Sequence, residues 1–300
     1  MTTECFIIEQ AEKDFDPCLV DISHDAICIF SDFLHKQSNK SVWAEFVNYG
    51  SHHLDKRSAI MFGILSVALS YQFWSYDSEG KITHYHHNGE DGSKGMLQAL
   101  KREWLQHSHP LNLMNAPLDD VWVRSVFGDI PNIDSRVRII TEIICDGYLD
   151  GITDYLLERI NNSIPYTMDD ALKVSTMLPK SYGGDKYFNK AIMLLTVIAS
   201  TLGSDTLSSS LAPQADDNIA RILRAMDILI YQDPISRLVD SRTSIEPNSN
   251  HELAIRASSV LACDLIAQKS EVPTDSVDGL LRRCNSFNKE IKHLTATTHY

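Results

Sequence analysis

Three aspartates lie in sequence surroundings that could suit a carboxylate to acid–base chemistry. Asp227 lies within the apolar stretch ILRAMDILIY, Asp233 directly precedes a proline, and Asp278 interrupts the stretch SVDGLL. A carboxylate among apolar neighbours can have a raised pKa and transfer protons, or it can cap the following helix. For each aspartate alone, capping is the commoner role, and spacing leaves both interpretations open.

Histidines are concentrated in one part of the chain, because seven of the twelve lie between His52 and His109. On a strand, His84 and His86 point to the same face and could provide two metal ligands, with a third from His52 or His53. No carboxylate stands at a known metal-ligand offset from them. We therefore predict solvated histidines and no metal site.

Aromatic and polar residues alternate in YQFWSYDSEGKITHYHHNG, residues 71–89. Two such runs around a polar, glycine-containing turn predict a β-hairpin. Tyr71, Phe73 and Tyr85 would share one face, while Trp74 would lie on the other. Aromatic pairs at strand spacing are more often core than ligand platform, and the hairpin alone does not decide between the two.

Bulk composition excludes some classes of function. The chain has 300 residues, is 43% hydrophobic and carries a net charge of -13, which argues against a broad nucleic-acid-binding surface. The six cysteines are scattered without CxxC spacing, as expected in a reducing compartment. No secretory signal begins the sequence, and the longest apolar run, residues 191–200, is shorter than the roughly 20 residues of a membrane span. We predict a cytoplasmic protein with no membrane partner.

Helical periodicity dominates the elements that must position these residues. Predicted helices cover residues 23–36, 95–105, 168–180, 185–203, 216–231 and 251–269, with two more in 134–162 that break near Gly147 or Gly151. The helix at 185–203 is apolar nearly all round and predicted to be buried, and Pro234 is expected to stop the helix at 216–231. The predicted fold class is mainly α with one small β-hairpin.

Several short segments follow one another in an order that resembles a known family. They are YQFWSYDSEGK (71–81), GMLQAL (95–100), DVWVRSVFGDIPNIDSR (120–136), YFNKAIMLLTV (187–197), ELAIRASSVLACDLI (252–266), DGLLR (278–282) and the closing residues around Thr295, Thr297 and Tyr300. Together they resemble the motifs of the queuosine salvage protein family, the queuosine 5′-phosphate N-glycosylases. The likeness spans nearly the whole chain.

The resemblance implies one helical domain over residues 1–300, related to the helix-hairpin-helix DNA glycosylases. It implies hydrolysis of the N-glycosidic bond of queuosine 5′-phosphate, which releases queuine, without a metal or organic cofactor. The expected partner is a small-molecule substrate, a nucleotide or another nitrogen heterocycle. Such a site needs an aromatic clamp, to which Phe73 and Trp74 correspond, a carboxylate beside the anomeric carbon, and cations for the phosphate.

The chain departs from the family's pattern at the positions that carry the chemistry. The motif F-A-D-Y-x-x-P aligns on Tyr231 and Pro234, which puts Ile230 where the catalytic Asp stands. Asp227 or Asp233 would then have to replace it. The motif D-Y-Y-L-W keeps its acid as Asp278, expected to contact the base.

Two further expectations concern cations. Arg282 stands where the motif D-Y-Y-L-W has Trp, and Lys190 remains as the one cation of the motif F-Y-K-R-A-Q. The resemblance thus implies catalytic roles for Asp227, Asp233 and Asp278. It implies substrate contacts for Phe73, Trp74, Tyr231, Ile230, Lys190 and Arg282.

Three functions remain open: an N-glycosidic hydrolase with a relocated carboxylate, a diverged biosynthetic enzyme acting on another small nitrogen-containing metabolite by acid–base chemistry, and a non-catalytic ligand-binding paralogue. The burial of the Asp227 side chain distinguishes the hydrolase from the other two functions. A buried Asp227 that faces Trp74 and Asp278 would favour hydrolysis. An Asp227 on the surface, together with Ile230 lining the pocket, would argue against the family reaction.

Overall fold

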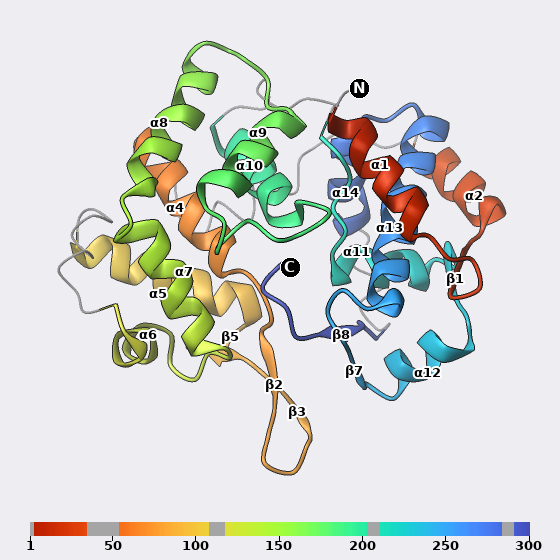
Figure 1. Ribbon diagram of the computed structural model, residues 1–300, viewed down its shortest axis with the longest axis horizontal. Coiled ribbons are helices and arrows are strands. Elements are labelled where there is room, and N and C mark those ends of the chain that lie inside the picture. Colours follow the sequence, from red (N-terminus) through yellow and green to blue (C-terminus); the bar gives the residue numbers. More distant parts are fainter. Residues whose placement is uncertain (1–2, 35–53, 108–117, 203–210, 284–290) are drawn as a thin grey trace. The chain divides into compact units, whose positions relative to one another are not determined.

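A computed structural model describes residues 3–34, 54–107, 118–202, 211–283 and 291–300. These residues form helices and short two-stranded sheets (Figure 1), so the predicted mainly α fold class is confirmed. The chain divides into two compact units. The terminal unit comprises Met1–Val42, Tyr166–Asp169 and Leu207–Thr297, and the central unit comprises Trp43–Pro165, Asp170–Thr206 and Thr298–Tyr300. That they act as one domain over 1–300 stays a prediction.

A long helix forms the core of the terminal unit. This helix, α13 (Asn250–Ser270), contacts α1 (Thr3–Asp14), α2 (His24–Leu34), α11 (Asp217–Ala225) and α14 (Thr274–Arg283). Ser249 caps its start by accepting a hydrogen bond from the Glu252 N–H at 3.3 Å. Ala254, Ala257 and Ser258 are fully buried, and such small side chains let neighbouring elements approach closely.

Short strands and one further helix complete the terminal unit. Strand β1 (Val20–Ile22) pairs antiparallel with β6 (Leu229–Tyr231), and β7 (Ser244–Ile245) pairs parallel with β8 (Leu294–Thr295). Helix α12 (Asp233–Asp240) lies between β6 and β7 in the chain. The parallel pair attaches the C-terminal segment to this unit.

The central unit is built around α4 (Lys56–Leu69), which is buried on nearly every side. It contacts α7 (Ile133–Ile144), α8 (Tyr148–Asn161) and α10 (Asn189–Leu202). The unit also contains α5 (Gly92–His107), α6 (Asp120–Phe127) and most of α9 (Met168–Met177). The break between α7 and α8 falls at Gly147, one of the two predicted positions, where the φ of 77° suits glycine.

The predicted hairpin is confirmed. Strands β2 (Trp74–Tyr76) and β3 (Ile82–His84) pair antiparallel, with Trp74 opposite His84, and form a narrow ribbon that extends away from the helices of the central unit (Figure 1). Asp77 closes the turn, because its Oδ1 accepts hydrogen bonds from the N–H groups of Glu79 and Lys81. A second small pair, β4 (His86–His87) with β5 (Glu90–Asp91), leads into α5.

Two predicted helices needed correction. The predicted helix at 216–231 ends at Ala225, and its apolar continuation forms β6 instead. Pro234 does not stop a helix but lies in the first turn of α12, where its missing N–H costs no hydrogen bond. The helix predicted from residue 185 begins at Asn189, because Asp185 accepts a hydrogen bond from the Asn189 N–H and Phe188 has a φ of 50°.

Candidate functional site

The predicted site residues fall into both units. Arg282, Tyr231, Ile230 and the three aspartates, Asp227, Asp233 and Asp278, belong to the terminal unit, while Phe73, Trp74 and Lys190 belong to the central unit. Each unit contains a cluster of buried polar or aromatic side chains. We call Gln214, Asp216, Asp278 and Arg282 the acidic–guanidinium cluster, and Tyr71, Phe73, Tyr85, Arg136 and Lys190 the aromatic–cation cluster.

Two packed helices position the acidic–guanidinium cluster. Asp216 is the N-cap of α11, and its Oδ1 accepts a hydrogen bond from the Ile219 N–H at 2.8 Å. Asp278 and Arg282 lie four residues apart on α14 and therefore share one face of that helix. Because α11 packs against α14, the cap of one helix meets this face of the other.

The Arg282 guanidinium lies among three acceptor groups. Its Nε donates to Oδ1 and Oδ2 of Asp278 at 3.1 and 3.0 Å. Its Nη2 donates to Oδ2 of Asp216 and to Oε1 of Gln214, the latter at 3.3 Å. The Arg282 side chain is 16% exposed, whereas those of Asp216 and Asp278 are 9% and 4% exposed. The cluster is thus a largely buried network of charge-assisted hydrogen bonds.

Electrostatics hold this cluster in its charged form. Burial alone would raise the pKa of Asp216, but the Arg282 guanidinium outweighs it, and the pKa lies below its usual value. Burial would lower the pKa of Arg282, yet the charges of Asp216 and Asp278 raise it. At neutral pH Asp216 therefore accepts hydrogen bonds and is not a proton donor. Burial, with these two carboxylates, raises the pKa of the nearby Cys263 thiol, so that sulfur is not an activated nucleophile.

Asp227 and Asp233 lie on the surface. Asp227 follows α11 in a left-handed turn with a φ of 55°, where its own side chain is exposed although the residues that follow it, Ile228 and Leu229, are buried. Asp233 is also exposed and forms an ion pair with Arg237, four residues further along α12. Neither is the buried carboxylate that the relocated-hydrolase hypothesis requires.

The motif position for the catalytic Asp lies on strand β6. Ile230 stands there, 44% exposed and opposite Asp21 in the antiparallel pair with β1. The next residue, Tyr231, is half-buried, and the Arg224 guanidinium lies 4.9 Å from the centre of its ring. An isoleucine side chain offers neither a base nor a hydrogen bond, so this position cannot stabilise developing positive charge.

In the central unit, two buried cations flank Tyr71. The guanidinium carbon of Arg136 lies 4.2 Å from the centre of the Tyr71 ring, and Nζ of Lys190 lies 4.4 Å from it. Phe73 stacks on Tyr85 with ring centres 6.0 Å apart. Burial lowers the pKa of Arg136 to about 10 and raises that of Tyr71 to about 12.

Both cations donate hydrogen bonds to backbone carbonyls near the end of α4. Lys190 Nζ donates to the Ala68 carbonyl, and Arg136 donates to the carbonyls of Tyr71 and Pro131. The carbonyl end of a helix carries partial negative charge and attracts cations. Burial, followed by the charge of Arg136, lowers the pKa of Lys190 well below its usual value. Lys190 thus binds the backbone near the end of α4, and the substrate contact predicted for it stays a prediction.

The aromatic pair of the hairpin has separate neighbours. Phe73 belongs to the stack with Tyr85, while Trp74 packs edge-on against Tyr76 with ring centres 5.6 Å apart. Both side chains are half-buried. Phe73 and Trp74 lie at the base of an extended ribbon, and their role as an aromatic clamp for a ligand stays a prediction.

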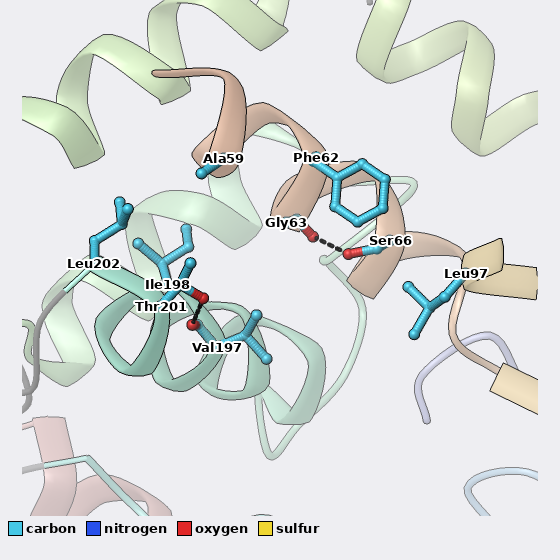
Figure 2. Close-up of a pocket in the computed structure, with 9 residues that line it drawn as sticks. All are labelled: Ala59, Phe62, Gly63, Ser66, Leu97, Val197, Ile198, Thr201 and Leu202. Atoms are coloured by element: carbon cyan, nitrogen blue, oxygen red, sulfur yellow. Dashed lines mark hydrogen bonds between the residues drawn. The ribbon is translucent and has the colours of Figure 1, made fainter. Parts of the chain in front are cut away.

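A small apolar pocket lies between α4 and α10 in the central unit (Figure 2). It is lined by Ala59, Phe62, Gly63, Ser66, Leu97, Val197, Ile198, Thr201 and Leu202. Its two hydroxyl groups donate to carbonyls of their own helices, Ser66 to Gly63 and Thr201 to Val197. With no charged group in its lining, this pocket lacks the groups that a glycoside or phosphate would need.

The histidine-rich segment yields no metal centre among the residues described. Within those residues, no three His, Cys, Asp or Glu side chains are placed to hold a metal ion. His86 Nδ1 pairs with Oδ1 of Asp91, and both side chains are exposed. His52, His53 and His109 lie outside the described residues.

One segment of the terminal unit matches a known protein family. Residues 207–287 match the family model of the queuosine salvage protein. This match confirms the resemblance over less than a third of the chain, and it includes β6 and all of the acidic–guanidinium cluster. A search of curated proteins gives no match to the chain. No helix in the described ranges is both long and apolar enough to cross a membrane.

Within the queuosine salvage segment, the sequence-based prediction missed Asp216 and Gln214. The available signal was the position of Asp216 just before an amphipathic helix, typical of an N-cap. Outside the segment it also missed Arg136, the last residue of DVWVRSVFGDIPNIDSR. A lone buried arginine is not visible in local spacing, because its acceptors include the Tyr71 carbonyl 65 residues away.

Proposed function

We propose that the protein is a diverged relative of the queuosine salvage proteins that acts on a small nitrogen-containing metabolite without a catalytic carboxylate at the family's motif position. One observation carries the proposal. In the matched segment the acid of the second motif, Asp278, is buried in a polar cluster, while the first motif position is the exposed Ile230. A buried polar cluster together with a changed catalytic position supports retained binding with altered chemistry.

The chemistry that the cluster supports is recognition through charge-assisted hydrogen bonds. Asp278 and Asp216 accept hydrogen bonds, and Arg282 donates them, in a site that is mostly shielded from water. Such bonds are roughly twice as strong as those between neutral groups. A metabolite with ring nitrogens or an amino group offers the complementary donors and acceptors. The three groups therefore suit binding and orientation of a heterocycle.

The second candidate is the family reaction, release of queuine from queuosine 5′-phosphate. The match over residues 207–287 favours it. The reaction needs a carboxylate beside the anomeric carbon to stabilise an oxocarbenium-like transition state. The two aspartates nearest the motif position, Asp227 and Asp233, are both exposed, which disfavours this candidate.

Incubation with queuosine 5′-phosphate distinguishes the two candidates. We expect binding without release of queuine, measured by calorimetry and by mass spectrometry of the products. Replacing Asp278 with Asn should weaken binding by about 10- to 100-fold, since a hydrogen bond to a charged group contributes about 1.5–3 kcal/mol. The matched control is Asp233→Asn, which changes an exposed carboxylate and should leave binding unchanged.

Two outcomes would contradict the proposal. Release of queuine that is lost on replacing Asp227 or Asp233 would establish the family reaction with a moved carboxylate. Equal binding by wild type and a folded Asp278→Asn variant would remove the cluster from the ligand site. The melting temperature of each variant shows whether a loss of binding comes from unfolding.

A further inference from the structure

Two buried cations of the central unit have no carboxylate paired with them. Arg136 is 0% exposed and Lys190 is 2% exposed. Among the described residues both donate hydrogen bonds to backbone carbonyls, and neither forms an ion pair. In the terminal unit, by contrast, the buried side chains of Arg256 and Arg282 pair with carboxylates. Because an unpaired charge is costly to bury, the aromatic–cation cluster requires a compensating negative charge.

The surrounding protein supplies only part of that charge. Lys190 Nζ donates to the Ala68 carbonyl at the end of α4, where a helix carries roughly half an elementary negative charge. The charge of Asp185 also acts on Lys190, but from beyond ion-pair distance, and this carboxylate accepts hydrogen bonds from the N–H groups of Tyr187 and Asn189. These contributions do not balance two cations.

Two buried donor atoms indicate where the remaining negative charge binds. Tyr71 Oη and Arg136 Nε have no hydrogen-bond partner among the described residues, although Tyr71 is only 1% exposed. The guanidinium carbon of Arg136 and Nζ of Lys190 lie 4.2 and 4.4 Å from the centre of the Tyr71 ring. A buried donor without an acceptor is destabilising. One anion that accepts from both atoms would satisfy the two donors and compensate the charge.

The packing around the cluster restricts this anion to a small one. Arg136 lies on α7 and Lys190 on α10, and both helices pack against α4, which Tyr71 follows in the chain. A phosphorylated nucleoside would carry its sugar and base into this packed interior. A spherical halide has no such attachment and accepts hydrogen bonds from any direction, so it suits two donors on different segments.

We propose that the aromatic–cation cluster is a binding site for a small monovalent anion of the chloride class, which accepts hydrogen bonds from Tyr71 Oη and Arg136 Nε and is held by the added charge of Lys190. The site stabilises the central unit and takes no part in a reaction. It goes beyond the proposed function, which concerns the terminal unit.

The melting temperature of the full chain in sodium chloride and in sodium gluconate tests this proposal. Both salts are used at about 150 mM, so that ionic strength is the same and only the size of the anion differs. We expect chloride to raise the melting temperature by about 3–6 °C over gluconate, the shift for a ligand at roughly 30 times its dissociation constant. The rise should saturate with chloride concentration, and bromide should replace chloride.

Tyr71→Phe separates this site from other effects of salt. In gluconate its melting temperature should stay within about 1 °C of wild type, because the hydroxyl that it removes has no partner. The apparent dissociation constant for chloride should rise about 10- to 100-fold, since a hydrogen bond to a charged group is lost. Lys190→Met removes one cation and should also lose the response to chloride.

Tyr182→Phe is the matched control. Tyr182 is a buried tyrosine of the same unit, 2% exposed, and its hydroxyl donates to the Ile64 carbonyl on α4. Loss of this satisfied hydrogen bond should lower the melting temperature by about 2–4 °C in both salts and leave the rise with chloride intact.

Three results would overturn the proposal. Equal melting temperatures of wild type in chloride and gluconate would mean that Lys190 relieves the buried charge by losing its proton. An unchanged chloride response in Tyr71→Phe would place the ion elsewhere. In crystals grown from sodium bromide we expect an anomalous peak within hydrogen-bond distance of Tyr71 Oη and Arg136 Nε, and bromide peaks confined to the surface would also refute the site. Queuosine 5′-phosphate is absent from all these measurements, so their outcome and that of the binding experiment are independent.

Discussion

Replacing Arg256 with alanine is expected to lower the free energy of unfolding by about 3–5 kcal/mol, the usual cost of removing one partner of a buried ion pair. The Arg256 and Glu252 side chains are 1% and 2% exposed, and Nη1 of Arg256 lies 3.3 Å from Oε1 of Glu252. Nε of Arg256 also donates to the Ala215 carbonyl at 2.9 Å, one residue before the α11 cap. The substitution therefore removes the cationic partner of the buried Glu252 carboxylate. It also removes the hydrogen bond that joins α13 to the segment carrying Asp216.

The exposed pair Asp233–Arg237 is the matched control. It has the same spacing of four residues on a helix, but its side chains are 70% and 77% exposed. Arg237→Ala should cost only about 0.2–1 kcal/mol, because water screens such pairs. Urea unfolding followed by circular dichroism measures both variants. Equal losses for Arg237→Ala and Arg256→Ala would show that burial does not set the strength of these pairs.

Most of the elements that local sequence signals predicted are present in the structure, whereas α1, α6, α12 and α14 were not predicted. The hairpin follows from alternation around the turn at Asp77, and the break at Gly147 follows from the need for a left-handed residue. The segment from 216 to 231 was the main error, because its apolar residues satisfy a helix pattern and a strand pattern equally well. Strand β1 decides the outcome by pairing with β6, although the two strands are far apart in the sequence.

The candidate site was predictable only where its partners are close in sequence. Asp278 and Arg282 share a helix face, and their four-residue spacing by itself indicates a contact. The contact of Arg282 with Asp216 joins residues 66 positions apart, and no local pattern predicts it. The same limit applies to Lys190, whose charge is visible in the sequence but whose acceptor, the Ala68 carbonyl, is 122 residues away.

The two clusters show how buried charge is used differently in the two units. In the aromatic–cation cluster, Arg136 and Lys190 donate to backbone carbonyls, so these cations hold the chain path around the end of α4. In the acidic–guanidinium cluster, Arg282 donates to the side chains of Asp278 and Asp216, and Asp216 also caps α11.

Acidification from about pH 6.5 to about pH 4 is expected to lower the stability of the terminal unit by about 3 kcal/mol through His293. His293 is 2% exposed, and burial lowers its pKa from 6.5 to about 4. The charges of Asp217 and Asp216 raise this pKa, while those of Arg256 and Lys292 lower it, and burial decides in favour of the neutral ring. Across this range the unfolded chain binds a proton that the folded chain does not, and stability therefore falls as pH falls.

A comparison of wild type with His293→Gln isolates this contribution. Both proteins carry the same carboxylates. The pKa of Asp216 is lowered from 3.8, so protonation of Asp216 reduces the stability of the fold mostly below pH 3.8, outside the range measured here. Urea unfolding at several pH values between about 4 and 7.5 should give a steeper fall for wild type, so that the difference between the two curves changes by about 3 kcal/mol toward pH 4. Parallel curves would mean that His293 has an ordinary pKa in the folded protein. In that case the ring would be charged beside Arg256 and Lys292, and the buried network on α13 would have to relax to accommodate it.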